Sequence, residues 1–257
     1  MYNSKGQVTG QGDPYCDIGG MFLEGLTVCV GYSDFLDVTL TENLDAYDEF
    51  VVVTSPTDKA THAVCTSHGV TCVKTDVFYE HGDSFNKGAG ISLGLAYLRH
   101  RGWIIHQDAD IVLPDRLRFM LNKSRLDADC IYGADRLNVT SYEKWLEVKN
   151  MPEYQRQYHH RFMVTPPQLP IGSRLIHNEL GYCPLGYFQL WNSKHHNRRY
   201  HFAQGSAEHT DLLFSAQWPA AKRILLPGFF VYHLESEPAT MGQNWAGRIT
   251  KPFKKQE

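Results

Sequence analysis

Short apolar runs alternate with helix-like spacing through the first half of the chain. Four runs have the length and composition of buried strands, at residues 26–30, 50–54, 69–73 and 103–107. Apolar residues three and four positions apart predict the intervening helices, over 35–47, after a cap at 55–58, and over 85–102. Alternation of strand and helix with short connections predicts an α/β fold with a doubly wound, mostly parallel sheet.

The pattern changes after Pro114. Further elements are expected as helices over 115–122 and from 207, and as strands at 128–132, 186–191, 223–226 and 229–232. Residues 138–175 are rich in Tyr and His, have little periodicity and read as a long insertion. We therefore expect a single domain with a nucleotide-binding half, an acceptor-side half with a smaller sheet, and a C-terminal tail, at 26–113, 114–235 and 236–257. Residues 1–24 are expected to be a loose arm.

Composition sets few limits on function. The 257 residues are 42% hydrophobic, which suffices to bury the core of one large domain, and the net charge of −3 does not decide for or against nucleic acid. No run approaches the ~20 apolar residues of a membrane span, and residues 1–17 lack the apolar core of a signal peptide. The six cysteines form no Cys-x-x-Cys pair, which favours reduced thiols in a cytoplasmic protein.

Two carboxylates end the fourth expected strand. Asp108 and Asp110 flank Ala109 between two apolar runs, 103–105 and 111–113. In an extended segment, residues two apart point to the same side, so both carboxylates face one place. Like charges held that close need a cation, a raised pKa or ample water. A divalent ion at the carboxyl end of a parallel strand would satisfy them. The alternative is a strand end with two solvated aspartates, since Asp-x-Asp is common by chance.

With these elements in place, the chain resembles the GT-A glycosyltransferases of the family 2 type, over roughly residues 26–235. Four features carry the resemblance: Asp108 and Asp110 after the fourth strand, Phe85-Asn86-Lys87-Gly88 opening the helix before it, Glu208-His209-Thr210-Asp211-Leu212, and His233 after a late strand. The segment Glu208-His209-Thr210-Asp211-Leu212 resembles the Glu-Asp-x-Asp-Leu helix start of that family. The resemblance implies transfer of a sugar from a nucleotide-sugar donor.

The resemblance also implies a donor site with a metal ion. The ion would act as a Lewis acid on the leaving diphosphate, and a carboxylate and imidazole set suits Mn²⁺ or Mg²⁺, with imidazole favouring Mn²⁺. Asp110 and His233 would be direct ligands, and Asp108 would bind through water or hold the ribose. Further donor-binding positions, with UDP as the expected nucleotide, are Gly31, Tyr32, Thr54, Asp58, Asn86, Lys87 and Ala109. On residue type alone, Lys87 is more often a solvated lysine.

The acceptor side departs from the family pattern. His209 stands where inverting members usually carry Asp, so Glu208 and Asp211 are the favoured general bases and His209 is the alternative. Inversion is implied by the resemblance. Candidate acceptor-binding residues are Tyr187, Trp191 and Arg198. The acceptor is expected to be a hydroxyl of a glycan, a protein or a hydroxylated DNA base, the last because residues 194–201 form a basic, aromatic loop.

Two other classes of protein are alternatives to a glycosyltransferase. A nucleotidyltransferase also joins paired aspartates to a nucleotide-binding sheet, but residues 31–36 lack the glycine run and basic residue expected after its first strand. A non-catalytic nucleic-acid-binding protein could use the basic runs at 194–201 and 251–255, although such runs are usually solvated loops.

Overall fold

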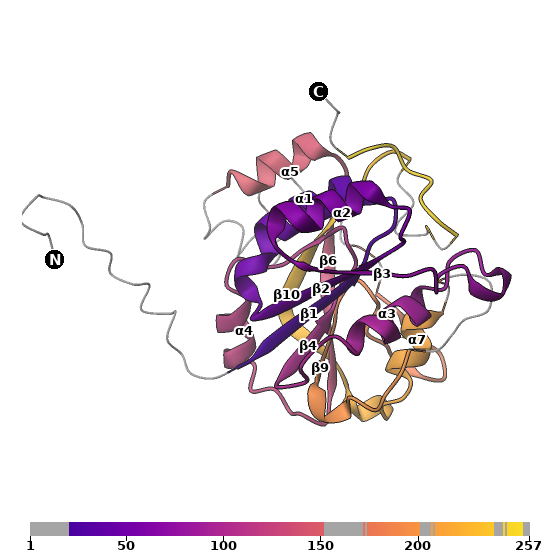
Figure 1. The fold of residues 1–257 in the computed structure, drawn as a ribbon. Helices are drawn as coiled ribbons and strands as arrows, with labels where there is room; N and C mark the ends of the chain where they lie inside the picture. Colours follow the sequence, from indigo (N-terminus) through magenta and orange to yellow (C-terminus); the bar gives the residue numbers. More distant parts are fainter. Residues whose placement is uncertain are drawn as a thin grey trace, which may run out of the picture.

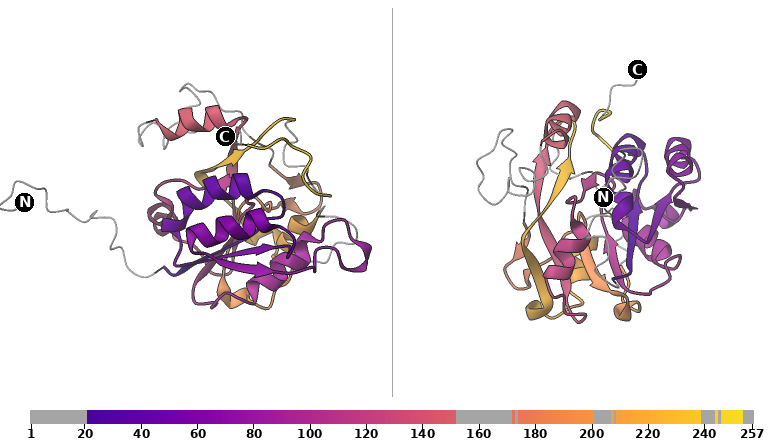
Figure 2. Two further views of the ribbon diagram at one scale, coloured as in Figure 1. Left: turned by 45° about the horizontal axis from the view of Figure 1, so that its top comes forward. Right: turned by 90° about the vertical axis from the view of Figure 1, so that its left-hand side faces the viewer.

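One eight-stranded sheet runs through the molecule, with strand order β3-β2-β1-β4-β9-β6-β10-β5. The computed structural model describes residues 21–151, 172, 174–200, 207, 209–238, 244 and 246–253. A separate two-stranded sheet pairs β7 (Ile176–His177) with β8 (Gly181–Tyr182). Figure 1 shows the large sheet between helices, and Figure 2 shows the indigo and purple N-terminal half beside the pink and orange C-terminal half. The predicted α/β fold with a mostly parallel sheet and a smaller second sheet is confirmed.

The first half consists of consecutive strand–helix repeats. Its elements are β1 (Leu23–Val28), α1 (Ser33–Asn43), β2 (Glu49–Thr54), α2 (Lys59–His68), β3 (Thr71–Lys74), α3 (Lys87–Leu95) and β4 (Trp103–His106). All strand pairs within it are parallel. Side chains alternate along β2, so Val52 packs with α1 and α2, whereas Val51 and Val53 pack with α3. The two groups of helices therefore cover opposite faces of the sheet (Figure 1).

The second half mixes strand directions. Its elements are β5 (Ile111–Val112), α4 (Leu117–Lys123), β6 (Ile131–Val139), α5 (Tyr142–Lys149), β9 (Gln189–Asn192), α7 (Thr210–Ser215) and β10 (Arg223–Leu234). Strand β9 runs antiparallel to both β4 and β6, and joins the two halves into one sheet. Strand β10 lies parallel to β6 and antiparallel to the short edge strand β5.

Three boundary predictions were wrong. The two strands expected at 223–226 and 229–232 are one strand, β10, whose register against β6 shifts between Leu225 and Phe230; Gly228 has φ +67° there. Such a bulge bends a strand without ending it, so its glycine imitates a turn signal. Helix α5 lies inside the expected insertion, whose residues 152–171 and 173 are outside the described part. Strand β1 begins two residues inside the expected N-terminal arm.

No helix in the described ranges is long and apolar enough to cross a membrane. The cysteines at 29, 65, 72, 130 and 183 are free thiols, and all but Cys72 are buried. The free thiols agree with the sequence-based expectation for these residues.

Candidate active site

A cavity of about 340 Å³ opens at the carboxyl ends of β1 and β4. Its walls come from the loop after β1, the start of α3, the loop after β4, the end of β10 and the C-terminal segment. The lining residues are Val28, Val30, Gly31, Tyr32, Tyr79, Ser84, Phe85, Lys87, Asp108, Ala109, Asp110, Ala207, His233, Asn244, Ala246, Gly247 and Arg248. Ligands of open α/β sheets bind at this edge, so the cavity lies where a nucleotide site is expected.

Asp110 and His233 meet because β5 pairs with β10. His233 is paired in register with Ile111, and the Leu234 amide donates to the Asp110 carbonyl oxygen at 2.9 Å. This places His233 Nε2 3.5 Å from Asp110 Oδ2. His233 Nδ1 lies 3.1 Å from Glu235 Oε1, so the second ring nitrogen faces another buried carboxylate. A carboxylate on one ring nitrogen fixes the orientation of a histidine whose other nitrogen faces a metal.

The Asp110–His233 pair attracts positive charge. Burial alone would lower the pKa of His233, but Asp110 and Glu235 outweigh it and raise that pKa to about 9. Asp110 Oδ1 is buried and accepts no hydrogen bond from any described residue. An oxygen and an imidazole nitrogen suit a divalent cation such as Mn²⁺. Among the described residues no three His, Cys, Asp or Glu side chains form a metal cluster, so a diphosphate and water would have to complete the coordination.

Lys87 connects two carboxylates from different halves of the chain. Its Nζ lies 2.5 Å from Asp108 Oδ1 and 3.9 Å from Asp211 Oδ1. Burial alone would lower the pKa of Lys87, yet the two carboxylates raise it above its ordinary value, so the ammonium stays charged. Burial alone would raise the pKa of Asp108, and the Lys87 ammonium lowers it instead. The charged Lys87–Asp108 pair is therefore built into the cavity wall.

Asp211 begins α7 and lies against a glycine. A Cβ at Gly186 would come within 2.3 Å of Asp211 Oδ1, so the position next to the carboxylate has room for no side chain. Oδ1 is buried without a hydrogen-bond partner among the described residues. Burial raises the pKa of Asp211, and Lys87 only partly counteracts this. A carboxylate with few hydrogen bonds and a raised pKa is suited to accept a proton.

The other two predicted bases are placed differently. His209 is exposed and precedes α7 as its N-cap residue, with φ +63° in the left-handed region. Glu208 lies outside the described residues.

Three predicted donor-binding residues do not line the cavity. The Asp58 carboxylate caps α2 by accepting from the Thr61 amide at 3.1 Å, and it also accepts from the Gly31 amide at 2.7 Å. Thr54 is fully buried, with its hydroxyl 3.5 Å from Asp58 Oδ2. Asn86 caps α3 by accepting from the Ala89 amide at 3.0 Å. Their hydrogen bonds are thus used within the protein.

Two of the three predicted acceptor-binding residues, Tyr187 and Trp191, belong to the core, and Arg198 is partly buried. Tyr187 is 3% exposed and donates from its hydroxyl to the Ala134 carbonyl oxygen at 2.7 Å. Trp191 is 1% exposed and packs edge-on against Phe214. The Arg198 guanidinium lies over the Trp218 ring at 4.2 Å. Their positions do not support assignment to an acceptor surface.

One lysine of each basic run has a carboxylate partner. Lys194 Nζ lies 2.6 Å from Asp129 Oδ1, and Lys251 Nζ lies 3.0 Å from Glu237 Oε2. Arg198 and Arg199 of the first run donate instead to backbone carbonyl oxygens, Arg198 to that of Gln217 and Arg199 to that of His196.

Sequence reasoning missed several residues around the cavity. Glu235 was detectable, because it stands two positions after His233, directly past the end of β10, and residues two apart in an extended chain point to the same side. Gly186 carries no signal in the sequence, since only the packing of α7 shows what its missing side chain leaves room for. The same holds for Arg248 and Tyr79, which reach the cavity from segments without recognisable motifs.

The architecture is that of GT-A glycosyltransferases, as the solved structures it resembles show. One is glucosyl-3-phosphoglycerate synthase from Mycobacterium tuberculosis in complex with Mn²⁺, UDP-glucose and phosphoglyceric acid. It matches with a TM-score of 0.50 at 12% identity, over 83% of this chain and 72% of that one. Mannosyl-3-phosphoglycerate synthase from Rubrobacter xylanophilus matches with a TM-score of 0.37 at 20% identity; 46% of this chain covers 42% of that one. No protein-family model and no curated protein sequence matches the chain.

Proposed function

We propose that the chain is a metal-dependent glycosyltransferase that moves a sugar from a nucleotide diphosphate sugar, with UDP as the nucleotide, to a hydroxyl group. One observation carries the proposal: the Asp110–His233 pair and the Lys87–Asp108 pair meet in a single cavity at the carboxyl edge of the sheet. A diphosphate needs cations, and a sugar transfer needs them most as the leaving group gains charge. This arrangement offers the diphosphate the Lys87 ammonium and, in Asp110 and His233, two groups suited to bind a metal cation.

Each residue of the donor side has a definable part. Asp110 and His233 would hold a divalent metal, which would supply Lewis-acid stabilisation of the leaving diphosphate. Glu235 orients the His233 ring through Nδ1. Lys87 places a permanent ammonium charge beside the same cavity, and Asp108 holds that ammonium in position. Tyr32 and Phe85 add aromatic walls against which a nucleoside can pack.

On the acceptor side, Asp211 is the proposed general base. It would take the proton from the attacking hydroxyl, for which its raised pKa and unsatisfied Oδ1 suit it. Direct attack assisted by one base inverts the anomeric centre. His209 and Glu208 remain the alternatives. The acceptor is proposed as a hydroxyl compound, and no contact in the described part of the chain favours a DNA base over a smaller hydroxyl compound.

The structural neighbours support the choice of ligands. The glucosyl-3-phosphoglycerate synthase complex contains Mn²⁺ and UDP-glucose. We therefore take UDP-sugars and Mn²⁺ as the first substrates to test, together with small phosphorylated and unphosphorylated hydroxyl acceptors. No observation in the structure favours a nucleotidyltransferase over a glycosyltransferase.

Thermal unfolding with UDP and Mn²⁺ tests the proposal. A ligand at 100 times its Kd should stabilise the wild-type protein by about 2.7 kcal/mol, and EDTA should abolish this. The Asp110→Asn variant should fold but lose the response. Asp129→Asn, which removes an exposed carboxylate far from the cavity, is the matched control and should respond normally. Mass spectrometry of UDP-sugar reactions then identifies transfer. If full transfer activity persisted in EDTA, the metal-dependent mechanism would be wrong.

A further inference from the structure

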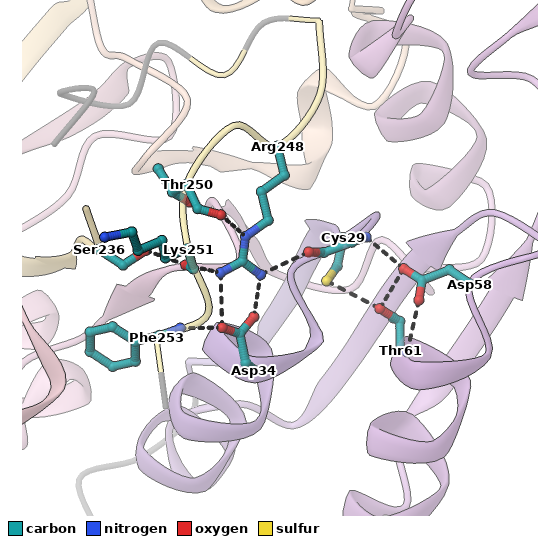
Figure 3. Close-up of polar contacts among 10 residues, drawn as sticks. Cys29, Asp34, Asp58, Thr61, Ser236, Arg248, Thr250, Lys251 and Phe253 are labelled. Atoms are coloured by element: carbon teal, nitrogen blue, oxygen red, sulfur yellow. Dashed lines mark hydrogen bonds and ion pairs between the residues drawn. The ribbon is translucent and has the colours of Figure 1, made fainter. Parts of the chain in front are cut away.

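The side chain of Arg248 uses all its hydrogen-bond donors inside the protein. Its Nη1 donates to Asp34 Oδ1 at 2.5 Å and to the Gly31 carbonyl oxygen at 2.9 Å. Nη2 donates to Asp34 Oδ2 at 2.9 Å and to the Lys251 carbonyl oxygen, and Nε donates to the Thr250 carbonyl oxygen. A guanidinium has five N–H groups, so none remains for a ligand. Figure 3 shows this fork between Asp34 and the backbone of the C-terminal segment.

The same guanidinium is stacked on aromatic rings of the donor half. Its carbon lies 4.9 Å from the centroid of the Tyr32 ring and 5.1 Å from that of Phe35. Tyr32 lines the cavity, and so does Arg248. Arg248 therefore supports Tyr32 from one side and fastens the C-terminal segment to the loop after β1.

Further contacts fasten the segment at both margins of the cavity. The Phe253 ring stacks on Phe35 at 4.6 Å, and the Phe253 amide donates to Asp34 Oδ2 at 2.5 Å. On the other margin, the Ser236 hydroxyl donates to the Lys251 carbonyl oxygen at 2.6 Å. Ser236 follows shortly after His233 at the end of β10. The segment thus connects helix α1 to the strand that supplies the histidine.

We propose that residues 246–248 form a built wall of the donor-nucleotide site, that residues 249–253 fasten this wall to the fold, and that Arg248 is the positioning residue that holds it against Tyr32. The proposal rests on the proposed function, because the ligand is the nucleotide of the donor. Arg248 acts through the shape of its fork and not as a charge that contacts phosphate.

Two side chains hold the loop after β1, one through a backbone amide and one through a backbone carbonyl oxygen. Asp58 accepts from the Gly31 amide, and Arg248 donates to the carbonyl oxygen of the same residue. Gly247, next to the anchor, has φ +122° and open space where a Cβ would stand. The wall therefore turns at a glycine that adds no bulk to the cavity.

Calorimetric titration of UDP in the presence of Mn²⁺ tests the proposal in the full chain. Arg248→Ala should raise the Kd of UDP by about tenfold or more, because the wall is no longer held in place in the free protein and the cost of ordering it falls on UDP binding. In transfer assays it should raise KM for the UDP-sugar by a similar factor and leave kcat within about threefold. Arg248→Lys should behave like Arg248→Ala, because an ammonium keeps the charge but lacks the fork.

Arg118→Ala is the matched control. Arg118 also donates to two backbone carbonyl oxygens, of Ala46 and Met21, and to the Asp48 carboxylate. None of these residues lines the cavity. Arg118→Ala should leave the Kd of UDP unchanged. If Arg248→Ala proves unstable by thermal unfolding, Phe253→Ala replaces it and should raise the Kd in the same direction. Wild-type affinity in a folded Arg248→Ala protein overturns the proposal, and rescue by Arg248→Lys would make Arg248 a phosphate ligand instead. Failure of wild-type protein to bind UDP would refute the proposed function itself.

Discussion

The two halves of the molecule bring chemical groups to the cavity in different ways. In the first half, Tyr32 follows β1, Lys87 opens α3 and Asp108 follows β4, so each group sits at a junction of a strand–helix repeat. In the second half, His233 arrives through antiparallel pairing of β10 with β5, and Asp211 through packing of α7 on Gly186. Junctions of a regular repeat are visible in sequence, whereas pairings between distant segments are not.

The halves also differ in how their aromatic residues are used. Tyr32 and Phe85 line the cavity, whereas Trp191 and Tyr187 are buried in or beside β9, a central strand. A strand with neighbours on both sides and layers on both faces has no free surface for a ligand. An aromatic-rich segment therefore indicates a binding surface only when its place in the sheet is known.

The largest expected effect tests the acceptor half. Asp211→Asn should lower kcat by about 10²–10⁴-fold and leave the Kd of UDP nearly unchanged, because it removes the proposed base but not a donor contact. Its folded-state pKa is raised, so ionisation of Asp211 costs stability as the pH rises through that value. The amide should therefore leave the melting temperature at pH 7 equal or higher. Stopped assays and thermal unfolding measure the two quantities.

His209→Ala provides the comparison for that experiment. The exposed imidazole should matter much less than Asp211, and kcat should stay within about tenfold of wild type. Near-normal turnover in Asp211→Asn together with an inactive His209→Ala would transfer the role of base to the histidine.

A large part of the donor site could be predicted from sequence, and much less of the rest. Asp108 and Asp110 are predicted because charge interrupts an apolar run, whereas Lys87 and His233 are predicted only through the family resemblance. The β5–β10 register explains why His233 reaches Asp110. Asp58 is predicted as a donor-binding residue but caps α2 outside the cavity lining, and a capping carboxylate and a binding carboxylate look alike in sequence. Arg248 lies far from every motif, and only the tertiary fold brings it to Tyr32.

A smaller effect is expected from Asp58, and it tests whether this residue of the donor half acts only as a helix cap. Asp58→Ala should cost about 1–2 kcal/mol of stability, because it removes a helix cap and leaves the Gly31 amide without its acceptor. UDP binding should weaken as well, through the loosened loop that carries Tyr32. Urea unfolding and calorimetry give both values.

Ser141→Ala is the matched cap variant for Asp58→Ala. The Ser141 hydroxyl caps α5 by accepting from the Lys144 amide at 3.2 Å, away from the cavity. It should cost about 1 kcal/mol of stability and leave UDP binding intact. Equal UDP affinity in both variants would mean that Asp58 is a cap and nothing more.

The smallest expected effect concerns pH and the C-terminal wall. Burial would raise the pKa of Asp34, but Arg248 and the Phe253 amide lower it below its ordinary value. A lowered folded-state pKa means that the stabilisation is present above the unfolded value of about 3.9 and is lost as the pH falls through the folded value. Asp34→Asn should therefore reduce stability by less than about 1 kcal/mol near pH 7, and the difference from wild type should shrink as the pH falls below about 4. A difference that is constant from pH 7 to pH 3 would contradict this account.

The pairing of β10 with β5 brings together two proposed metal ligands, Asp110 and His233, that are far apart in the sequence. Asp110 lies before the middle of the sequence and His233 near its end, and a two-residue edge strand holds them together. A fragment that stops before β10 would contain every repeat of the first half and still lack His233, one of the two proposed metal ligands. The first half therefore cannot be moved to another protein with the proposed metal-binding pair complete, because His233 lies on the distant strand that pairs with β5.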